Sequence, residues 1–429
     1  MKKGFSKIKD FFKVFGPGVI TGAADDDPSG IATYTQTGAK FGYGLLWTAV
    51  AMLPLMVAIQ EACARIGAVS GHGLAAVIKA NYSRKVLYAA VLLVVVANTI
   101  NIGADIGAIT AAAQLIIPLN FVILALGFTT LILILEIFTT YRVYSRILKW
   151  LALTLLAYPL TLFIIDKPWK TILAATFLPQ FELNFEFFFI ITAVLGTTIS
   201  PYMFFWQASQ EVEEEKAQHL IGRYGIPKIG EKYIRNLRID NFVGMLLSEF
   251  TTWSIIVVAA TVLHENGITN VESAADAAKA LEPLVQTFPN AGFLSKLIFA
   301  TGIIGLGLLG IPILSGSAAY ALSETFNMKE GLNLKLKKAY GFYGVITVAT
   351  LIGLLINFIG IDPIKALVFT AVFNGVAAVP LIFLIARIAR NSKIMGEYRS
   401  GWLSNTVVWI TFLVMSASAV AMFYTLFRG

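Results

Sequence analysis

Long apolar segments, separated by short polar ones, follow one another along the whole chain. A helix that crosses a bilayer needs about 20 predominantly apolar residues, and this criterion predicts eleven spans. They lie near residues 15–39, 45–68, 86–116, 119–139, 147–165, 186–207, 240–263, 293–322, 340–359, 363–386 and 404–427. We therefore expect an all-α, polytopic membrane protein whose apolar surface meets a lipid bilayer.

Two of the predicted spans contain residues that break helices. The first span carries DDDPSG at residues 25–30, and the sixth carries GTTISPY at residues 196–202. Each is the first of five consecutive spans, and because five is odd, the second set would start on the opposite side of the membrane. Such a pair of interrupted helices is typical of inverted-repeat transporters that bind their substrate near the bilayer midplane. The pattern predicts a five-plus-five inverted repeat with helices 1 and 6 unwound.

The spans divide the chain into four parts. These are a basic N-terminus (1–14), a first repeat (15–165), a second repeat (166–386) and a final loop with span 11 (387–429). Residues 211–232, rich in both charge signs, are expected to form a cytoplasmic loop with a short amphipathic helix. Residues 264–290 are expected outside the membrane, with a short helix at 274–278.

Lys and Arg residues gather on one side of the predicted topology. Loops on the cytoplasmic side of a membrane carry an excess of these residues. If the N-terminus is cytoplasmic, all but seven of the 33 Lys and Arg residues lie on the cytoplasmic side. The exceptions are Lys40, Lys167, Lys170, Lys279, Lys296, Lys365 and Arg428. The asymmetry places the protein in the plasma membrane with its N-terminus cytoplasmic and its C-terminus extracellular.

The composition agrees with a membrane protein and narrows the function. Charged residues make up 14% of the chain, against about 25% in soluble domains. The net charge of +8 follows from the loop asymmetry, so no nucleic-acid partner is expected. The single cysteine, Cys63, excludes an intrachain disulfide and is expected to be a packed thiol. No nucleophile with a base and no phosphate-binding loop is evident, so we expect a monomeric non-enzyme without a cofactor.

The carboxylates inside the first span point to a cation. Ionisable side chains at membrane depth are costly and mark substrate or ion pathways. An unwound backbone is tolerated there only where it is buried in protein or lines a cavity. The freed carbonyls and a nearby carboxylate would then be oxygen ligands for a hard cation.

Several motifs resemble the Nramp (natural resistance-associated macrophage protein) family of divalent metal transporters. They are GPG at 16–18, DPSG at 27–30, QEACARIG at 60–67, GADIG at 103–107 and SPY at 200–202. The family usually has DPGN and MPH where this chain has DPSG and SPY. The resemblance implies the five-plus-five fold of amino-acid transporters (LeuT-like) and a divalent metal ion as the substrate.

The departures from the family pattern concern the expected metal ligands. The usual site joins an Asp and an Asn from span 1 to a Met thioether and a carbonyl from span 6. This chain keeps the Asp as Asp27, but Gly30 replaces the Asn and Ser200 replaces the Met, while Thr197 adds a hydroxyl. Sulfur ligands favour transition metals, and oxygen ligands suit Mg²⁺ and Mn²⁺. The smaller residues are expected to enlarge the pocket for a partly hydrated Mg²⁺, as in the Nramp-related magnesium transporter branch, with Mn²⁺ also accepted. Asn374 on span 10 resembles, by position, an amide that some relatives bring toward the ion.

Proton coupling is a second departure. The family's usual route employs two span 6 histidines and an acidic pair on span 3. This chain has Tyr202 and Gln207 on span 6, and Asp105 with Ala108 on span 3; its three histidines, His72, His219 and His264, fall in loops. We expect uptake without protons, because a divalent ion gains about 4.6 kcal/mol per 100 mV. Two alternatives stay open: a proton-coupled transition-metal (manganese or iron) transporter and an organic-solute carrier of the same fold. A channel is disfavoured because no repeated filter loop is evident.

The remaining polar residues in the spans allow more than one interpretation. Asp25 and Asp26 either line a vestibule or face lipid headgroups, and Asp105 either binds a counter-cation or pairs inside the bundle. Glu136 is expected at the interface or paired with Arg142. Asn98 and Asn101 are expected to form interhelical hydrogen bonds.

Overall fold

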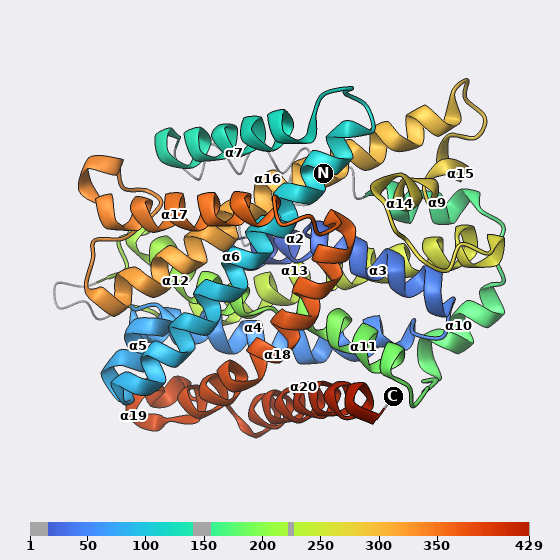
Figure 1. Cartoon of the computed structure of the whole chain (residues 1–429). Helices are drawn as coiled ribbons and strands as arrows, with labels where there is room; N and C mark the ends of the chain where they lie inside the picture. The colour runs from blue at the N-terminus through green and yellow to red at the C-terminus, as the bar shows by residue number, and fades with distance from the viewer. Residues whose placement is uncertain (1–15, 140–155, 222–226, 429) are drawn as a thin grey trace, which may run out of the picture.

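The computed structural model describes residues 16–139, 156–221 and 227–428, which fold into a bundle of helices (Figure 1). No strand occurs in these residues, and their only bridge joins Ile221 to Pro227. The predicted all-α class is confirmed over these ranges.

The helices of the first half follow the predicted spans closely. They are α2 (Pro17–Asp25), α3 (Pro28–Phe41), α4 (Trp47–Ser70), α5 (Leu74–Asn81), α6 (Arg84–Gln114), α7 (Phe121–Phe138) and α9 (Ala157–Ile164). The predicted fifth span begins in residues outside the described ranges, and α9 forms its last part. A short helix, α10 (Trp169–Phe177), leads to the second half.

The second half repeats the arrangement of one broken helix followed by longer ones. Its helices are α11 (Phe185–Thr198), α12 (Pro201–Ala217), α13 (Glu231–Val262), α14 (Ala274–Lys279), α15 (Glu282–Val285), α16 (Ala291–Phe326), α17 (Tyr340–Ile356), α18 (Pro363–Arg390), α19 (Ser392–Met395) and α20 (Trp402–Arg428). Three single 3-10 turns, η2 (His264–Asn266), η3 (Leu336–Lys338) and η4 (Gly396–Tyr398), lie in the connections.

Eight helices in the described ranges are long and apolar enough to cross a membrane. They include α4, α6, α7, α16, α18, α20, the α11–α12 pair and α13 with its following turn. The α2–α3 pair is broken into shorter pieces, and α17 is apolar but shorter. The protein is therefore a multi-pass membrane protein, and the count of eleven spans stays a prediction.

The broken helices lie inside the bundle, and α7 and α20 lie at its edges (Figure 1). The most apolar window of the α11–α12 pair is 89% buried, whereas those of α7 and α20 are 28% and 33% buried. Helices α7 and α20 therefore present most of their apolar surface outward, as lipid-facing helices do, and the interior is left to the residues around the two breaks.

Glycines let the central helices approach backbone to backbone. A Cβ at Gly22 of α2 would lie 2.4 Å from the carbonyl oxygen of Gly244 on α13. A Cβ at Gly196 of α11 would lie 2.0 Å from the carbonyl oxygen of Ala371 on α18. Small residues at helix contacts are the usual means of tight packing in membranes. Both broken helices are thus held firmly beside an unbroken partner.

The predicted cytoplasmic loop at 211–232 is wrong in its first part. Helix α12 continues to Ala217, and α13 begins at Glu231, so the connection is shorter than expected. Glu211 is buried. It accepts a hydrogen bond from the Gln207 amide over 3.1 Å and another from the Tyr233 hydroxyl over 3.2 Å. Charge density alone suggested a loop, but the carboxylates of Glu211, Glu213 and Glu215 on α12 are buried. The short helix expected at 274–278 is present as α14.

Glu136 lies inside the helix bundle and not on its surface. Its side chain is buried, and the Ser315 hydroxyl of α16 donates a 2.6 Å hydrogen bond to it. The alternative partner, Arg142, lies outside the described residues. Asn98 forms the expected interhelical hydrogen bond, to the carbonyl of Leu314 over 2.9 Å, and Cys63 is buried as expected.

Candidate metal site

Two helix breaks form the framework of the site. Helix α2 ends at Asp25, and Asp27 is the N-cap of α3, which begins at Pro28. Helix α11 ends at Thr198, and α12 begins at Pro201 after Ser200. Proline suits the first position of a helix because a backbone N–H at that position has no partner within the helix, so its absence costs nothing. The C-terminal ends of α2 and α11 carry partial negative charge, which favours a cation between them.

The two carboxylate oxygens of Asp27 have different surroundings. Oδ1 accepts hydrogen bonds from the Ser29 hydroxyl at 2.6 Å and from the Gly30 N–H at 3.0 Å. Oδ2 has only two long contacts of 3.3 Å, from the Asn101 amide and the Tyr202 hydroxyl. Because Asp27 is 1% exposed and Oδ1 is used to cap α3, Oδ2 is the oxygen best placed to bind an ion.

Hydroxyl groups connect the two breaks. The Ser29 and Thr197 hydroxyls lie 3.1 Å apart, and the Tyr34 hydroxyl lies 2.8 Å from that of Thr198. Thr197 is therefore connected to Asp27 through the Ser29 hydroxyl, and its role in holding a hydrated ion stays a prediction.

Ser200 is directed toward its own helix. Its hydroxyl donates toward the carbonyls of Gly196 and Thr197, at 2.5 and 2.9 Å. These carbonyls are released by the break, so Ser200 satisfies acceptors that an ion could otherwise use. The oxygen of Ser200 keeps its lone pairs and remains a possible ligand.

Asn374 reaches the site through another amide. Its Nδ2 donates to Oδ1 of Asn101 over 3.5 Å, and Nδ2 of Asn101 in turn donates to Oδ2 of Asp27. Helix α18 thus acts on the carboxylate through Asn101 of α6.

Gly30 does not open space in this conformation, contrary to the expected enlargement of the pocket. A Cβ at Gly30 would lie 3.2 Å from the carbonyl oxygen of Asp25, 3.3 Å from the ring of Tyr34 and 3.5 Å from Oγ1 of Thr197. The volume that a side chain would need is filled by Tyr34 and Thr197. The exchange of Asn for Gly therefore leaves no cavity beside Asp27 in this conformation.

Asp105 on α6 lies close to the same site. A Cβ at Gly310 of α16 would lie 3.4 Å from the Asp27 Cβ and 3.7 Å from Oδ2 of Asp105. Both oxygens of Asp105 are buried without a hydrogen-bond partner. The pairing expected under the structural interpretation of Asp105 is therefore not observed.

The donors around Asp27 fit an ion that keeps part of its water. No group of three or more His, Cys, Asp or Glu residues in the described ranges could hold a metal ion directly. One carboxylate with neutral oxygens around it matches the way Mg²⁺ is commonly bound. Sequence reasoning did not assign Ser29, Asn101 and Tyr202 to the site, although all three contact Asp27. Their polarity inside apolar spans was the available signal.

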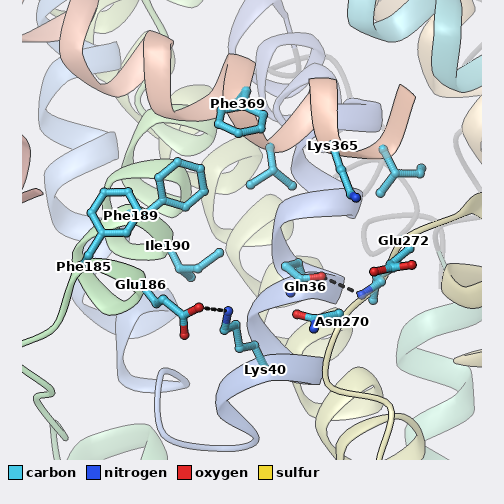
Figure 2. A pocket seen from close by; sticks show the side chains of 13 residues that line it. Gln36, Lys40, Phe185, Glu186, Phe189, Ile190, Asn270, Glu272, Lys365 and Phe369 are labelled. Atoms are coloured by element: carbon cyan, nitrogen blue, oxygen red, sulfur yellow. Dashed lines mark hydrogen bonds and ion pairs between the residues drawn. The ribbon is translucent and has the colours of Figure 1, made fainter. Parts of the chain in front are cut away.

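A cavity on the predicted outer side lies beyond α3 and α11 (Figure 2). It measures about 550 Å³ and is lined by residues of α3, α11, α18 and the segment before α14. An ion pair of 2.7 Å between Lys40 and Glu186 joins α3 to α11, and Gln36 accepts a 2.8 Å hydrogen bond from the Val271 N–H. Since Asp27, Thr197 and Ser200 are each 1% exposed, the site itself is closed to solvent in this conformation.

The fold is that of inverted-repeat membrane transporters. The structure matches an Eremococcus coleocola manganese transporter, with a TM-score of 0.74 and 16% identity over 96% of this chain and 86% of that one. It also matches Mhp1, a nucleobase-cation-symport-1 family transporter, with a TM-score of 0.58 and 13% identity over 96% and 92% of the two chains.

Sequence comparison defines the family. Residues 18–425 match the family model described as natural resistance-associated macrophage protein-like (Nramp). A divalent metal cation transporter, MntH, of Caldanaerobacter subterraneus subsp. tengcongensis is 26% identical over 98% of this chain and 95% of its own length. MntH of Agrobacterium fabrum is also 26% identical, over 97% and 88%. The chain belongs to the Nramp family, and its relatives are transporters rather than enzymes.

Proposed function

We propose that this protein carries divalent metal cations across the membrane and binds them at Asp27. The observation that carries the proposal is a buried carboxylate, between two broken helices, whose Oδ2 has only long contacts with Asn101 and Tyr202. The relatives named as divalent metal cation transporters support the same substrate class.

The transported ion is proposed to be hard, either Mg²⁺ or Mn²⁺. Oxygen and amide groups surround Asp27, and Ser200 offers a hydroxyl where the family usually has a thioether. These groups favour a Mg²⁺ ion that keeps several waters. The name of the Eremococcus coleocola structure favours manganese. Both ions take octahedral oxygen sites, so flux measurements on the two ions decide between them.

Proton coupling is the point on which the two candidate functions differ. None of the three histidines lies on α2, α3, α11 or α12, which favours uptake driven by the membrane potential alone. The unpaired carboxylate of Asp105 beside the site favours the alternative, a proton-coupled transition-metal transporter. Histidine is the residue best suited to titrate near neutral pH, but a buried carboxylate could replace it.

An organic-solute carrier of the same fold is the weaker alternative. Mhp1 shares the fold at 13% identity. The charge of Asp27 would repel the carboxylate of an amino acid unless a cation stood between them. The carrier hypothesis therefore also requires a cation at Asp27.

Uptake by the purified protein in liposomes tests the proposal. Mg²⁺, Mn²⁺, Ca²⁺ and Cd²⁺ would be offered separately at a fixed membrane potential, with the internal pH recorded together with the metal. We expect Mn²⁺ and Mg²⁺ to enter without internal acidification. Acidification that follows Mn²⁺ entry would establish the coupled alternative, and the absence of any metal flux would refute the proposed function.

A further inference from the structure

A pocket lined by charged side chains lies at the predicted cytoplasmic end of the bundle. It measures about 690 Å³ and is formed by the first turns of α13 and the connection between α19 and α20. Its lining contains four cationic side chains and two carboxylates, which are Lys232, Arg235, Arg238, Arg399, Glu231 and Glu397. Within the described residues, none of Lys232, Arg235 and Arg399 forms an ion pair. The pocket therefore carries a positive charge that the protein does not neutralise.

A buried ion pair on α4 holds both walls of this pocket. Arg65 donates to the carbonyl of Tyr398 at 2.5 Å and to the hydroxyl of Ser400 at 2.9 Å, which fixes the backbone on either side of the position between them. Glu61 accepts from Nε of Arg238 at 2.9 Å, which fixes the opposite wall. The Arg238 side chain is still 58% exposed. The cationic groups are thus held in place before any ligand arrives.

Exposed apolar side chains begin where the charged lining ends. Ile239 and Phe242 follow Arg235 by four and seven positions, so they continue the same face of α13. They are 39% and 47% exposed. On the other wall, Trp402 at the start of α20 is 82% exposed, and tryptophan is enriched where a membrane meets water. The pocket therefore lies at the edge of the bilayer, where α13 and α20 enter their predicted spans.

The charge and the position of the pocket select one class of ligand. A hydrated metal cation would be repelled by the surplus of positive charge, and a small soluble anion would make no use of the apolar surface. The cytoplasmic leaflet contains anionic lipids, and basic pockets beside membrane helices on that side bind their headgroups. Guanidinium groups bind phosphate oxygens through paired hydrogen bonds.

We propose that this pocket binds the headgroup of an anionic phospholipid from the cytoplasmic leaflet. The phosphate lies among Arg235, Arg238 and Arg399, and the hydroxyls of the headgroup donate to the two carboxylates of the lining. The acyl chains follow the exposed side chains of Phe242 and Trp402. A lipid in this position joins the connection before α20 to the start of α13.

Lipid binding by the purified full-length protein in detergent tests the proposal. Native mass spectrometry would give the apparent Kd for dioleoyl phosphatidylglycerol and for dioleoyl phosphatidylcholine. The pocket variant neutralises three exposed cations of the lining: Lys232→Gln, Arg235→Gln and Arg399→Gln. The matched control removes three exposed cations from the connection between α16 and α17: Lys335→Gln, Lys337→Gln and Lys338→Gln. Two single variants, Arg399→Gln and Arg399→Lys, change one side chain each.

We expect the apparent Kd for phosphatidylglycerol to rise at least about tenfold in the pocket variant and to stay unchanged in the control. Arg399→Gln should weaken binding, and Arg399→Lys should weaken it less because the charge is kept. Phosphatidylglycerol should raise the unfolding temperature of wild type and control but not that of the pocket variant. Unchanged binding in the pocket variant, or an equal loss in pocket variant and control, would overturn the proposal. Equal affinity for phosphatidylcholine would also overturn it, as would competition by glycerol 3-phosphate at the same concentration as the lipid.

Discussion

The carboxylate of Asp240 accepts a 2.7 Å hydrogen bond from the backbone N–H of Gly18. Its other oxygen accepts from the Gly16 N–H at 2.8 Å. A side chain of α13 thus caps the first turn of α2, whose free N–H groups need partners. Thr21 of α2 also donates to Gln207 of α12. These contacts fix the half-helix that ends at the carboxylates of the site.

Replacing Asp240 by Asn is expected to loosen α2. Asn keeps the size of Asp and one acceptor oxygen but loses the charge, so one of the N–H groups of Gly16 and Gly18 loses its partner, at a cost of about 1–3 kcal/mol. A cysteine introduced at Ala23 would report the change through its rate of thiol labelling in detergent, because the native Cys63 is buried. We expect faster labelling in Asp240→Asn than in the parent. An equal rate in the two proteins would show that the cap does not hold α2.

The ion pair between Arg65 and Glu61 is expected to be a major contributor to stability. Arg65 is fully buried, and its guanidinium meets both oxygens of Glu61 at 2.8 and 3.0 Å. Arg65→Met would leave the buried Glu61 with Arg238 alone, and breaking such a pair costs about 3–5 kcal/mol. Arg238→Gln is the control, since the Arg238 side chain is 58% exposed and its contribution is about 0–1 kcal/mol. Unfolding in detergent compares them, and equal losses would contradict the assignment.

The sequence is sufficient to locate the two breaks but not to arrange the site around them. Proline and carboxylates inside apolar runs have few explanations other than an unwound helix, so Asp27 and Ser200 could be found. The roles of Asn101 and Tyr202 depend on how α6 and α12 pack against α3, which no local pattern encodes. Gly30 shows the same limit, because the space that its missing side chain leaves is occupied by Tyr34 from the next turn.

Charge patterns were the least reliable guide to exposure. Glu211 was expected in a loop, and Glu136 at the interface or paired with Arg142, yet each is buried and accepts a hydrogen bond from a hydroxyl of another helix. A tertiary hydrogen bond can offset part of the cost of burying a carboxylate, and its donor is distant in sequence.

Exchanging Ser200 for Met is expected to shift the ion preference. A thioether favours soft ions. The ratio of Cd²⁺ uptake to Mg²⁺ uptake, measured in competition, should therefore rise by a factor on the order of ten. Ser416→Met adds the same sulfur on α20, a helix that takes no part in either break, and should leave the ratio unchanged. An unchanged ratio in Ser200→Met as well would refute the argument from missing sulfur.

Glu330, in the connection after α16, is expected to make stability depend on pH. Burial and then the charge of Glu324 raise the pKa of Glu330 to about 9 from its ordinary 4.5. The folded protein therefore holds this proton more tightly than the unfolded chain, and stability falls as the pH rises from about 5 to 9. Glu330→Gln should unfold at a higher temperature than wild type at pH 8, with a smaller difference at pH 5. A difference independent of pH would contradict the burial of this carboxyl.

Mn²⁺ uptake by Asp27→Asn in liposomes tests the central claim most directly. Asn keeps an oxygen acceptor for the Ser29 hydroxyl and the Gly30 N–H but removes the charge that the ion needs. Asp276→Asn is the control, because it neutralises a half-buried carboxylate on α14, outside the two helix breaks, whose ion-pair partner is Lys279. We predict that uptake falls at least about tenfold in Asp27→Asn, equivalent to about 1.4 kcal/mol, and is unchanged in Asp276→Asn. Undiminished uptake by a folded Asp27→Asn protein would contradict the account.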